Sequence, residues 1–387
     1  MAFDPAERLK VLPPYLFAEI DKKKKALIAA GRDVINLGIG DPDTPTPEFI
    51  IEELRRAAGD PKNHQYALDA GLPEFRRAAA DWYAHRFDVT LDPDTEVLPT
   101  IGSKEAIAHF PLAVLNPGDV ALVPEPGYPP YRSGAIFAGA EVYLMPLVAR
   151  NEFLPELDAI PQGVLERAKL IYVNYPNNPT AAVASKAFYA AVVDFAKKHD
   201  LIVASDAAYT EVYYDEKPMS FLEVPGAKDV GIEFHSLSKT FSMTGWRLAF
   251  AVGNAQLVSH LGRLKTNLDS GIFQAIQFAG VKALERVDEV TPRLVAMYRA
   301  RRDALVDGFT RAGWNVTPPK ATFYVWIPTP NGRSSTDVAA RLLEEADIVV
   351  TPGIGFGPSG EGFVRAALTV PEERIREAAE RIAKLKF

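Results

Sequence analysis

The stretch AKLIYVNYP, residues 168–176, is apolar at consecutive positions in its centre rather than at alternate ones. A strand with this pattern is buried on both faces, as in a mainly parallel sheet that helices cover on both sides. Helical patterns, such as residues 103–115 and 186–199, lie between this run and six others. The other runs are residues 95–100, 119–125, 140–146, 201–206, 231–236 and 247–253. The sequence therefore predicts an α/β fold with a mainly parallel seven-stranded sheet and helices on both faces.

The last part of the chain has a different pattern. A long helical segment at residues 292–312 is followed by three apolar runs and by a helix from Pro371 onward, which indicates a smaller α+β unit. A chain of 387 residues is long enough for two domains. We expect a large domain at residues 46–280 and a small domain made of residues 1–45 and 281–387.

The composition excludes several classes of protein. The chain has no cysteine, so it has no disulfide framework and no cysteine-based metal site, and we expect no metal. The net charge of −7 argues against nucleic acid as the main partner. The N-terminal residues MAFDPAERLK lack the apolar segment of a signal peptide, and no run approaches the roughly 18 apolar residues of a membrane span. We expect a cytoplasmic protein with no membrane partner.

Polar residues follow several of the predicted strands, where ligands bind in open α/β sheets. Gly102, Ser103 and Lys104 form a turn at a helix start, where free N–H groups suit a phosphate; the alternative is an ordinary N-cap by Ser103. Asn178 precedes a proline, which pushes its backbone to an extended form, and a plain turn is the alternative there. Asp206 ends another strand, where a structural ion pair is the alternative to a functional carboxylate.

The stretch EFHSLSKTFSMTGWRLAF, residues 233–250, contains a single lysine, Lys239, and an arginine, Arg247, eight positions later. A desolvated lysine can lose its proton near neutral pH and attack carbonyl groups, and an arginine offers a fork of donors to a phosphate. We expect Gly245 to bend the chain so that Arg247 begins the next strand. Pyridoxal 5'-phosphate requires a lysine for its aldehyde, an anion site and an acid for its ring nitrogen, so this set predicts that cofactor.

The motifs SLSKTFSMTGWR, NYPNNPT, SDAAY and EPGYPPY together resemble fold-type I aminotransferases of class I/II, and the resemblance covers essentially the whole chain. It implies that Lys239 forms the Schiff base and later moves the substrate α-proton. It implies that Asp206 holds the proton on the pyridine nitrogen. Asn178 and Tyr209 match donors to the ring hydroxyl oxygen, and Tyr128 matches the aromatic residue stacked on the ring.

The same resemblance assigns the remaining site residues. Tyr66 matches a tyrosine that reaches the phosphate across a dimer interface, so we expect a homodimer with its sites at that interface. Arg365 matches the arginine that clamps the substrate α-carboxylate, and Gly40 matches the backbone that closes over it. The positions that match phosphate-binding residues are Ser103, Lys104, Ser236 and Arg247, with Gly102 in the same turn.

Finer resemblance indicates the LL-diaminopimelate aminotransferase group, through stretches such as LPPYLFAEIDKKK and VTPGIGFGPSGEGFVRAALT. The resemblance implies a substrate-holding role for Tyr15 and transfer of an amino group from LL-diaminopimelate to 2-oxoglutarate, or the reverse, in lysine biosynthesis. One segment departs from the pattern: YALDAG places Ala70 where relatives carry a glutamate, and its acid is Asp69, one residue earlier. The distal end of the substrate is recognised differently if Asp69 does not reach it.

Three other functions therefore stay open at this point. The first is an aminotransferase of broader specificity, acting on glutamate, alanine or aromatic amino acids. The second is another pyridoxal-phosphate enzyme on the same fold, such as a C–S β-lyase or a synthase that eliminates from the side chain, because Lys239, Asp206 and Arg247 serve the first steps that such enzymes share. The third is a binding protein that keeps the fold without turnover, although no helix-turn-helix or basic extension is attached.

Overall fold

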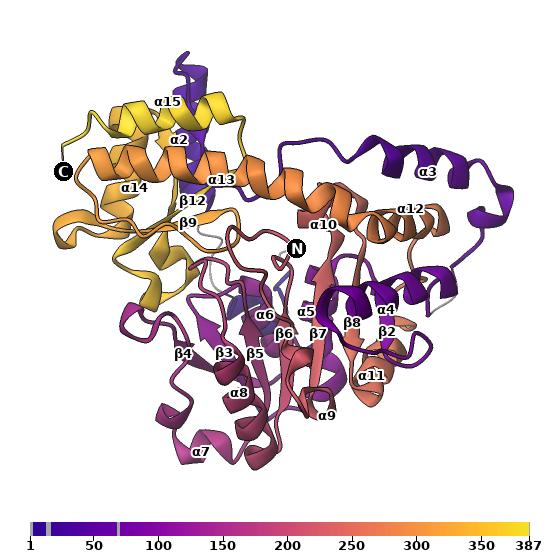
Figure 1. Ribbon diagram of the computed structural model, residues 1–387. Helices are drawn as coiled ribbons and strands as arrows, with labels where there is room; N and C mark the ends of the chain where they lie inside the picture. Colours follow the sequence, from indigo (N-terminus) through magenta and orange to yellow (C-terminus); the bar gives the residue numbers. More distant parts are fainter. Residues whose placement is uncertain (1–2, 13–16, 68–69, 387) are drawn as a thin grey trace.

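The computed structural model of the protein describes residues 3–12, 17–67 and 70–386 (Figure 1). Its main element is a seven-stranded sheet with the strand order β2-β8-β7-β6-β5-β3-β4. Strands β3 to β7 run parallel, whereas β8 is antiparallel to both of its neighbours. The strands are β2 (Val97–Thr100), β3 (Val120–Glu125), β4 (Glu141–Pro146), β5 (Ala168–Asn174), β6 (Ile202–Asp206), β7 (Gly231–Ser236) and β8 (Ala249–Gly253). Each lies within or closely matches one predicted run, so the predicted α/β sheet is confirmed.

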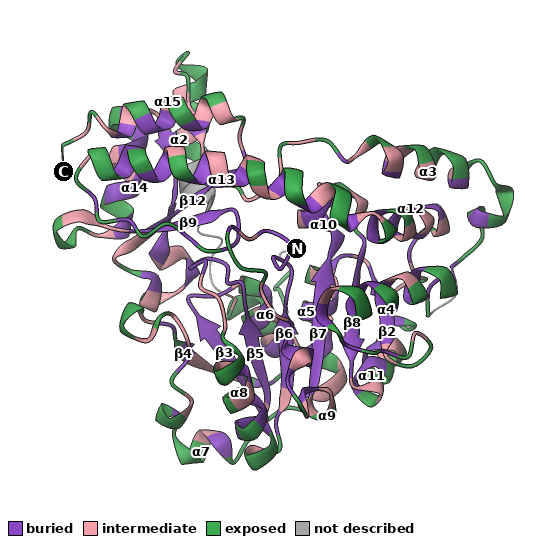
Figure 2. Cartoon of the chain, in the orientation of Figure 1, coloured by how far each residue is buried: buried purple, intermediate pink, exposed green. Residues whose placement is uncertain are grey.

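Helices cover both faces of this sheet, and the pattern of β5 shows why its apolar residues are consecutive. Leu170 and Tyr172 pack into the core beneath α5, α6 and α11, whereas Ile171 and Val173 pack into the core beneath α4, α8 and α12. Figure 2 shows the strands buried between these two layers. The helices are α4 (Pro73–Phe87), α5 (Ser103–Val114), α6 (Pro129–Phe137), α8 (Lys186–His199), α11 (Ala255–Lys265) and α12 (Gln274–Glu285).

Local signals fix the ends of these helices. The Ser185 side chain accepts a hydrogen bond from the Phe188 N–H and caps the N-terminus of α8. Three basic residues lie in its last turn, where they face the negative end of the helix dipole, and Asp200 ends it in a left-handed conformation. The helix therefore spans the predicted helical range, residues 186–199.

A smaller unit packs beside one end of the large sheet (Figure 1). Its three-stranded antiparallel sheet has the order β11-β12-β9, and a parallel pair joins β1 to β10. These strands are β1 (Ile35–Asn36), β9 (Tyr324–Pro328), β10 (Ile348–Val349), β11 (Thr351–Pro352) and β12 (Phe363–Ala367), and the helices include α13 (Val287–Arg311), α14 (Ser335–Ala346) and α15 (Glu372–Ile382). Because Ile35 pairs with Ile348, the N-terminal residues share this unit's core. The domain limits at residues 46 and 280 stay a prediction, which this pairing supports.

No helix in the described part of the chain is both long enough and apolar enough to cross a membrane.

Candidate active site

A cavity of about 700 Å³ lies where the ends of the large sheet's strands face the smaller unit. It brings together most of the residues that the sequence predicted, although they come from segments far apart in the chain. The predicted residues that line it are Gly40, Ser103, Lys104, Tyr128, Asn178, Asp206, Tyr209, Ser236, Lys239, Arg247 and Arg365. Gly102 lies directly behind this lining, against the side chain of Arg247.

Lys239 lies in the short helix α10 (Leu237–Thr240), which follows β7 directly. Its Nζ donates a hydrogen bond to the carbonyl oxygen of Gly40 at 3.0 Å and lies 5.5 Å from the centre of the Phe323 ring. Burial lowers the pKa of Lys239 because the charged ammonium is poorly solvated there. A lower pKa gives a larger fraction of neutral amine, which is the form that attacks a carbonyl.

Asp206 ends β6 and is almost fully buried at the wall of the cavity. The Tyr131 hydroxyl donates to its Oδ2 at 2.7 Å, and the Ala208 N–H donates to its Oδ1 at 3.2 Å. Burial nevertheless raises the pKa of Asp206 from 3.8 to about 6. Among the described residues no lysine, arginine or histidine forms an ion pair with it, so the structural ion pair considered from the sequence is not found. The carboxylate is therefore placed to pair with a cationic group in the cavity.

The raised pKa makes stability depend on pH in the cofactor-free protein. Between about pH 4 and pH 6 the folded state holds a proton on Asp206 that the unfolded state has lost, so the free energy of unfolding falls as pH rises. Asparagine does not titrate, so Asp206→Asn removes this fall in the free energy of unfolding. We expect Asp206→Asn to gain on the order of 3 kcal/mol relative to the wild type between pH 4 and pH 7, from the two-unit shift. Urea unfolding of both apoproteins across this range measures it; parallel pH profiles would contradict the prediction.

A second group of residues forms a cradle for an anion at the start of α5. Gly102 is the N-cap residue of this helix, with a φ of +79°, and no side chain caps it. The alternative in which Ser103 is the N-cap is therefore wrong, since Ser103 is the first helical residue. The free N–H groups of the first turn and the guanidinium of Arg247 face the same space. The Ser236 side chain accepts a hydrogen bond from the Ser238 N–H and caps α10 beside it.

Gly102 is required here by space as well as by backbone conformation. A Cβ on Gly102 would lie 2.2 Å from Nη2 of Arg247, whereas a Cβ on Gly118, which also has a positive φ, would meet nothing within 4 Å. We expect both Gly102→Ala and Gly118→Ala to lose about 1 kcal/mol of stability from backbone strain. Only Gly102→Ala should also weaken cofactor binding, by at least tenfold. Thermal unfolding and cofactor titration of the two apoproteins separate these effects; equal cofactor affinities would contradict the prediction.

The chain between Lys239 and β8 follows a path that differs from the expected one. Gly245 does not make the bend, because positive φ values fall on Ser242 (+53°) and on Arg247 (+57°) instead. A short 3₁₀ helix, Thr244–Trp246, lies between them, and the strand begins at Ala249 rather than at Arg247. Arg247 donates to the carbonyl oxygen of Thr244 at 2.7 Å, which holds its side chain over the cradle. The predicted bend at Gly245 and the predicted start of the strand are thus wrong, and Arg247 still reaches the cavity.

Arg365, on β12, is the cationic group at the opposite wall. Its Nη1 donates to Oδ1 of Asn178 at 2.8 Å, and its Nη2 donates to the carbonyl oxygen of Gly38 at 2.9 Å. Its guanidinium lies between two aromatic rings, 4.2 Å from the centre of Tyr324 and 4.7 Å from that of Phe356. The buried Nε has no partner in the described part of the protein. A buried guanidinium with a free donor suits a carboxylate ligand.

Tyrosines complete the cavity, and its lining includes residues that were not predicted, among them Tyr131 and Asn174. Tyr128 precedes α6, and Tyr131, one helical turn later, contacts it edge to face at 5.8 Å and binds Asp206. The motif EPGYPPY contains both tyrosines, so the i, i+3 spacing was a usable signal for Tyr131. Asn174 was also missed: its amide donates to the Asp206 carbonyl oxygen at 2.8 Å, and its Oδ1 accepts from the Asn178 N–H at 2.9 Å. Asn174 is the last residue of β5 and pairs in register with Asp206 on β6. Its place at the end of a strand was therefore a usable signal in the sequence.

Tyr66 does not reach this cavity within one chain. Its side chain is 85% exposed, beside a second opening that it shares with Ile272 and Phe273. Tyr15 and Asp69, which the sequence placed near the substrate, lie outside the described residues, and Ala70 is exposed. The contact of Tyr66 with the phosphate of a second copy stays a prediction.

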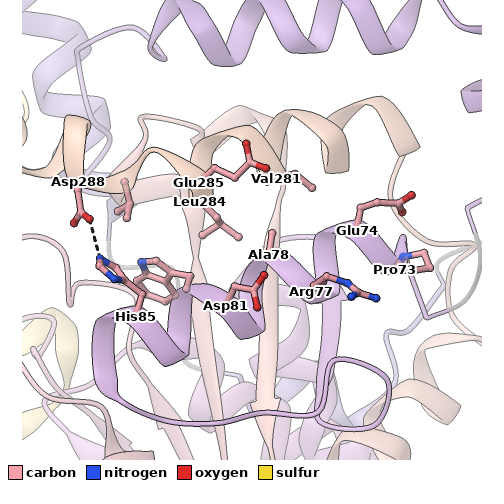
Figure 3. Close-up of a pocket in the computed structure, with 12 residues that line it drawn as sticks. Pro73, Glu74, Arg77, Ala78, Asp81, His85, Val281, Leu284, Glu285 and Asp288 are labelled. Carbon is pink, nitrogen blue, oxygen red and sulfur yellow. Dashed lines mark hydrogen bonds and ion pairs between the residues drawn. The ribbon is translucent and has the colours of Figure 1, made fainter.

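A third hollow, of about 730 Å³, lies between α4 and α12 (Figure 3). Apolar and charged side chains line it together, and His85 contacts Asp288 at 2.8 Å across it. None of the predicted site residues lines it. Among the described residues no group of histidines and carboxylates could hold a metal ion. The predicted site residues gather in the cavity around Lys239 instead.

Comparison with known proteins agrees with this geometry. The sequence pattern of the family described as aminotransferase class I and II matches residues 32–382. The chain is 57% identical to the LL-diaminopimelate aminotransferase of Syntrophobacter fumaroxidans over 100% of both chains, and 55% identical to that of Aquifex aeolicus, again over 100% of both. Among solved structures, apo-BacF from Bacillus subtilis superposes with a TM-score of 0.95 at 43% identity, covering 100% of this chain and 99% of that one. The chain belongs to the class I and II aminotransferases.

Proposed function

We propose that this enzyme is an LL-diaminopimelate:2-oxoglutarate aminotransferase of lysine biosynthesis. The observation that carries this proposal is the identity of 52–57% with LL-diaminopimelate aminotransferases along almost the full length of each. Class I and II aminotransferases use pyridoxal 5'-phosphate and transfer the amino group in two half-reactions, so the first product leaves before the second substrate binds. The cytoplasm is the location we propose for it, with amino acids and 2-oxo acids as its substrates.

The residues of the cavity fit this cofactor in three independent ways. The half-buried Lys239 has a lowered pKa, the buried Asp206 forms no ion pair with any described residue, and the start of α5 offers N–H donors next to Arg247. These groups suit an aldehyde, a ring N–H⁺ and a phosphate respectively. When bound, pyridoxal 5'-phosphate supplies a conjugated ring that accepts the electron pair released at the substrate α-carbon.

The role of each side chain follows from its chemistry. Lys239 would hold the cofactor covalently, and its amine would then take the substrate α-proton and return it. Asp206 would stay ionised beside the ring nitrogen and keep a proton there, while Tyr131 donates to its Oδ2. Tyr209 and Asn178 would donate to the ring hydroxyl oxygen, and Tyr128 would cover the ring. Gly102, Ser103, Lys104, Ser236 and Arg247 would hold the phosphate.

The substrate α-carboxylate binds Arg365. Two donors of this guanidinium already hold Asn178 and Gly38, so the side chain is fixed before the substrate arrives. Gly40 forms the adjacent wall, where its carbonyl oxygen holds Lys239. A carboxylate fixed at this point sets the direction of the Cα–H bond relative to Lys239, which is the geometry that proton transfer requires. Tyr15 is proposed to hold the same end of the substrate.

A panel of amino donors tests the substrate. We expect LL-diaminopimelate alone to convert the yellow enzyme to its colourless amine form, and 2-oxoglutarate to restore the yellow form. A preference for glutamate, alanine or aromatic donors over LL-diaminopimelate would favour the broader enzyme, which the YALDAG segment keeps as the second candidate. Pyruvate released from cystathionine without an amine form would show a C–S β-lyase. No spectral change with any donor would show a binding protein.

We propose that the enzyme is a homodimer. Tyr66 is 85% exposed, and Phe273, which lines the same opening, is 42% exposed, which leaves an aromatic surface uncovered. We propose that a second copy covers it and that Tyr66 reaches the phosphate of that copy. Sedimentation of the active enzyme should show a dimer, and Tyr66→Phe should weaken cofactor binding. A fully active monomer would refute this assembly.

A further inference from the structure

Tyr324, the first residue of β9, brings a side chain of the smaller unit into the cavity. It is 3% exposed, and its hydroxyl oxygen lies 3.3 Å from the hydroxyl oxygen of Tyr209. Within the described part of the chain, Tyr209 is the only hydrogen-bonding partner of the Tyr324 hydroxyl. Burial and the neighbouring Tyr324 raise the pKa of Tyr209 well above its usual value, so the Tyr209 phenol keeps its proton at neutral pH.

In the hydrogen bond between the Tyr209 and Tyr324 hydroxyls, one hydroxyl donates and the other accepts. Each hydroxyl carries one hydrogen, so a tyrosine that donates to a third group can only accept from its neighbour. Tyr209 is proposed above to donate to the cofactor ring oxygen, which leaves its own oxygen free to accept. We infer that Tyr324 is a positioning residue that donates its hydrogen to Tyr209 and thereby fixes Tyr209 as a donor towards the cofactor. This inference rests on the proposed role of Tyr209.

The backbone before Tyr324 is built to hold it in this place. Thr322 has a φ of +66°, which is a strained value for a β-branched residue. Its N–H donates to the Val212 carbonyl oxygen at 2.7 Å, and its carbonyl oxygen accepts from the Tyr214 hydroxyl at 2.7 Å. Its Oγ1 accepts from the Tyr324 N–H at 3.0 Å. The strand that carries Tyr324 is thus tied to the segment that follows Tyr209, so the two phenols keep their separation.

Two further contacts surround the hydroxyl and the ring of Tyr324. A Cβ on Gly40 would lie 1.9 Å from the Tyr324 hydroxyl oxygen, so this oxygen lies directly against the backbone that holds Lys239. The Tyr324 ring covers the guanidinium of Arg365 at 4.2 Å. Replacing Tyr324 by phenylalanine keeps the ring over Arg365 and removes only the hydroxyl. This substitution therefore isolates the hydrogen bond to Tyr209.

The test is the pH midpoint of the visible absorption band of the holoenzyme. A donor at the ring oxygen favours its anionic form, so the lysine-linked nitrogen loses its proton at a lower pH. Without Tyr324 as donor, Tyr209 becomes a weaker donor, and the midpoint rises. We expect Tyr324→Phe to raise it by about half a pH unit, since one hydrogen bond is involved and its oxygens are 3.3 Å apart. The turnover number kcat should fall several-fold while KM changes little.

A double-mutant cycle separates this role from a structural one. Tyr209→Phe should raise the midpoint further than Tyr324→Phe, and the double variant should match Tyr209→Phe alone. Tyr298→Phe is the matched control, because Tyr298 is a fully buried tyrosine of the same core whose hydroxyl has no partner in the described chain. Its midpoint should equal that of the wild type.

The outcomes that contradict the inference are distinct. If Tyr209→Phe shifts the midpoint and Tyr324→Phe does not, Tyr324 has no such role and the proposed role of Tyr209 stands. Additive shifts in the double variant would show that Tyr324 acts on the cofactor by another route, and the inference fails. If Tyr209→Phe leaves the midpoint unchanged, both roles are wrong.

Discussion

Replacing Lys239 by alanine is expected to leave a folded protein that cannot transfer an amino group. Lys239 lines the cavity and donates a hydrogen bond to the Gly40 carbonyl oxygen. Burial lowers its pKa towards the range where an amine acts as a base. A missing general base alone lowers a rate by on the order of 10⁴-fold. The covalent link to the cofactor is lost as well. Stopped-flow absorbance of the half-reaction with LL-diaminopimelate measures the effect.

The amine itself, and not a change of fold, should account for this loss. A small primary amine added to Lys239→Ala has room in the space left by the side chain and should restore part of the rate. Lys282→Ala is the matched control, because Lys282 is a surface lysine that pairs with Glu285 on α12. Its rate should equal that of the wild type. Normal turnover by Lys239→Ala would show that another residue moves the proton.

The large sheet could be predicted from sequence because a strand that is buried on both faces is apolar at consecutive positions, and this pattern is visible in the sequence itself. Leu170, Ile171, Tyr172 and Val173 alternate between two separate cores, so each position must be apolar. The polar residues at the strand ends were predictable for the same reason, since parallel strands place their carboxyl ends at one edge. Asp206 is the clearest case, because a carboxylate at the end of a buried strand is costly to keep ionised unless it has a partner.

The contacts between distant segments could not be predicted. Tyr324 lies 115 residues from Tyr209, and nothing in its local sequence distinguishes it from a core tyrosine. The path from Ser242 to Arg247 was also wrong, because the left-handed conformation falls on a serine and an arginine beside an available glycine. Tertiary contacts select those two residues: the Ser242 carbonyl oxygen accepts from Thr46 at 2.8 Å, and Arg247 packs on Gly102.

The second large effect is expected when Arg365 is replaced. Lysine and alanine at this position separate the effect of the positive charge from that of the guanidinium geometry. Lysine keeps the charge but not the fork, and its ammonium cannot bind Asn178 and Gly38 and still offer aligned donors to a carboxylate. Removing one member of a buried, hydrogen-bonded charge pair costs about 2–5 kcal/mol. We therefore expect kcat/KM to fall by about 10²-fold in Arg365→Lys and by about 10³-fold in Arg365→Ala. Steady-state kinetics with donor and acceptor measure both, since each substrate carries an α-carboxylate.

A comparison of substrates shows whether the lost interaction is the one with the α-carboxylate. An amine that lacks this carboxylate gains nothing from Arg365, so Arg365→Lys should slow the amino acid strongly and the amine little. Arg76→Lys is the matched control, because Arg76 is also buried, donates to the Pro93 carbonyl oxygen and to Asp94, and has an unpaired Nε in the described structure, but lies outside the cavity. It should lose stability and keep the wild-type KM. Equal losses for both substrates in Arg365→Lys would mean that Arg365 supports the fold of the site rather than the carboxylate.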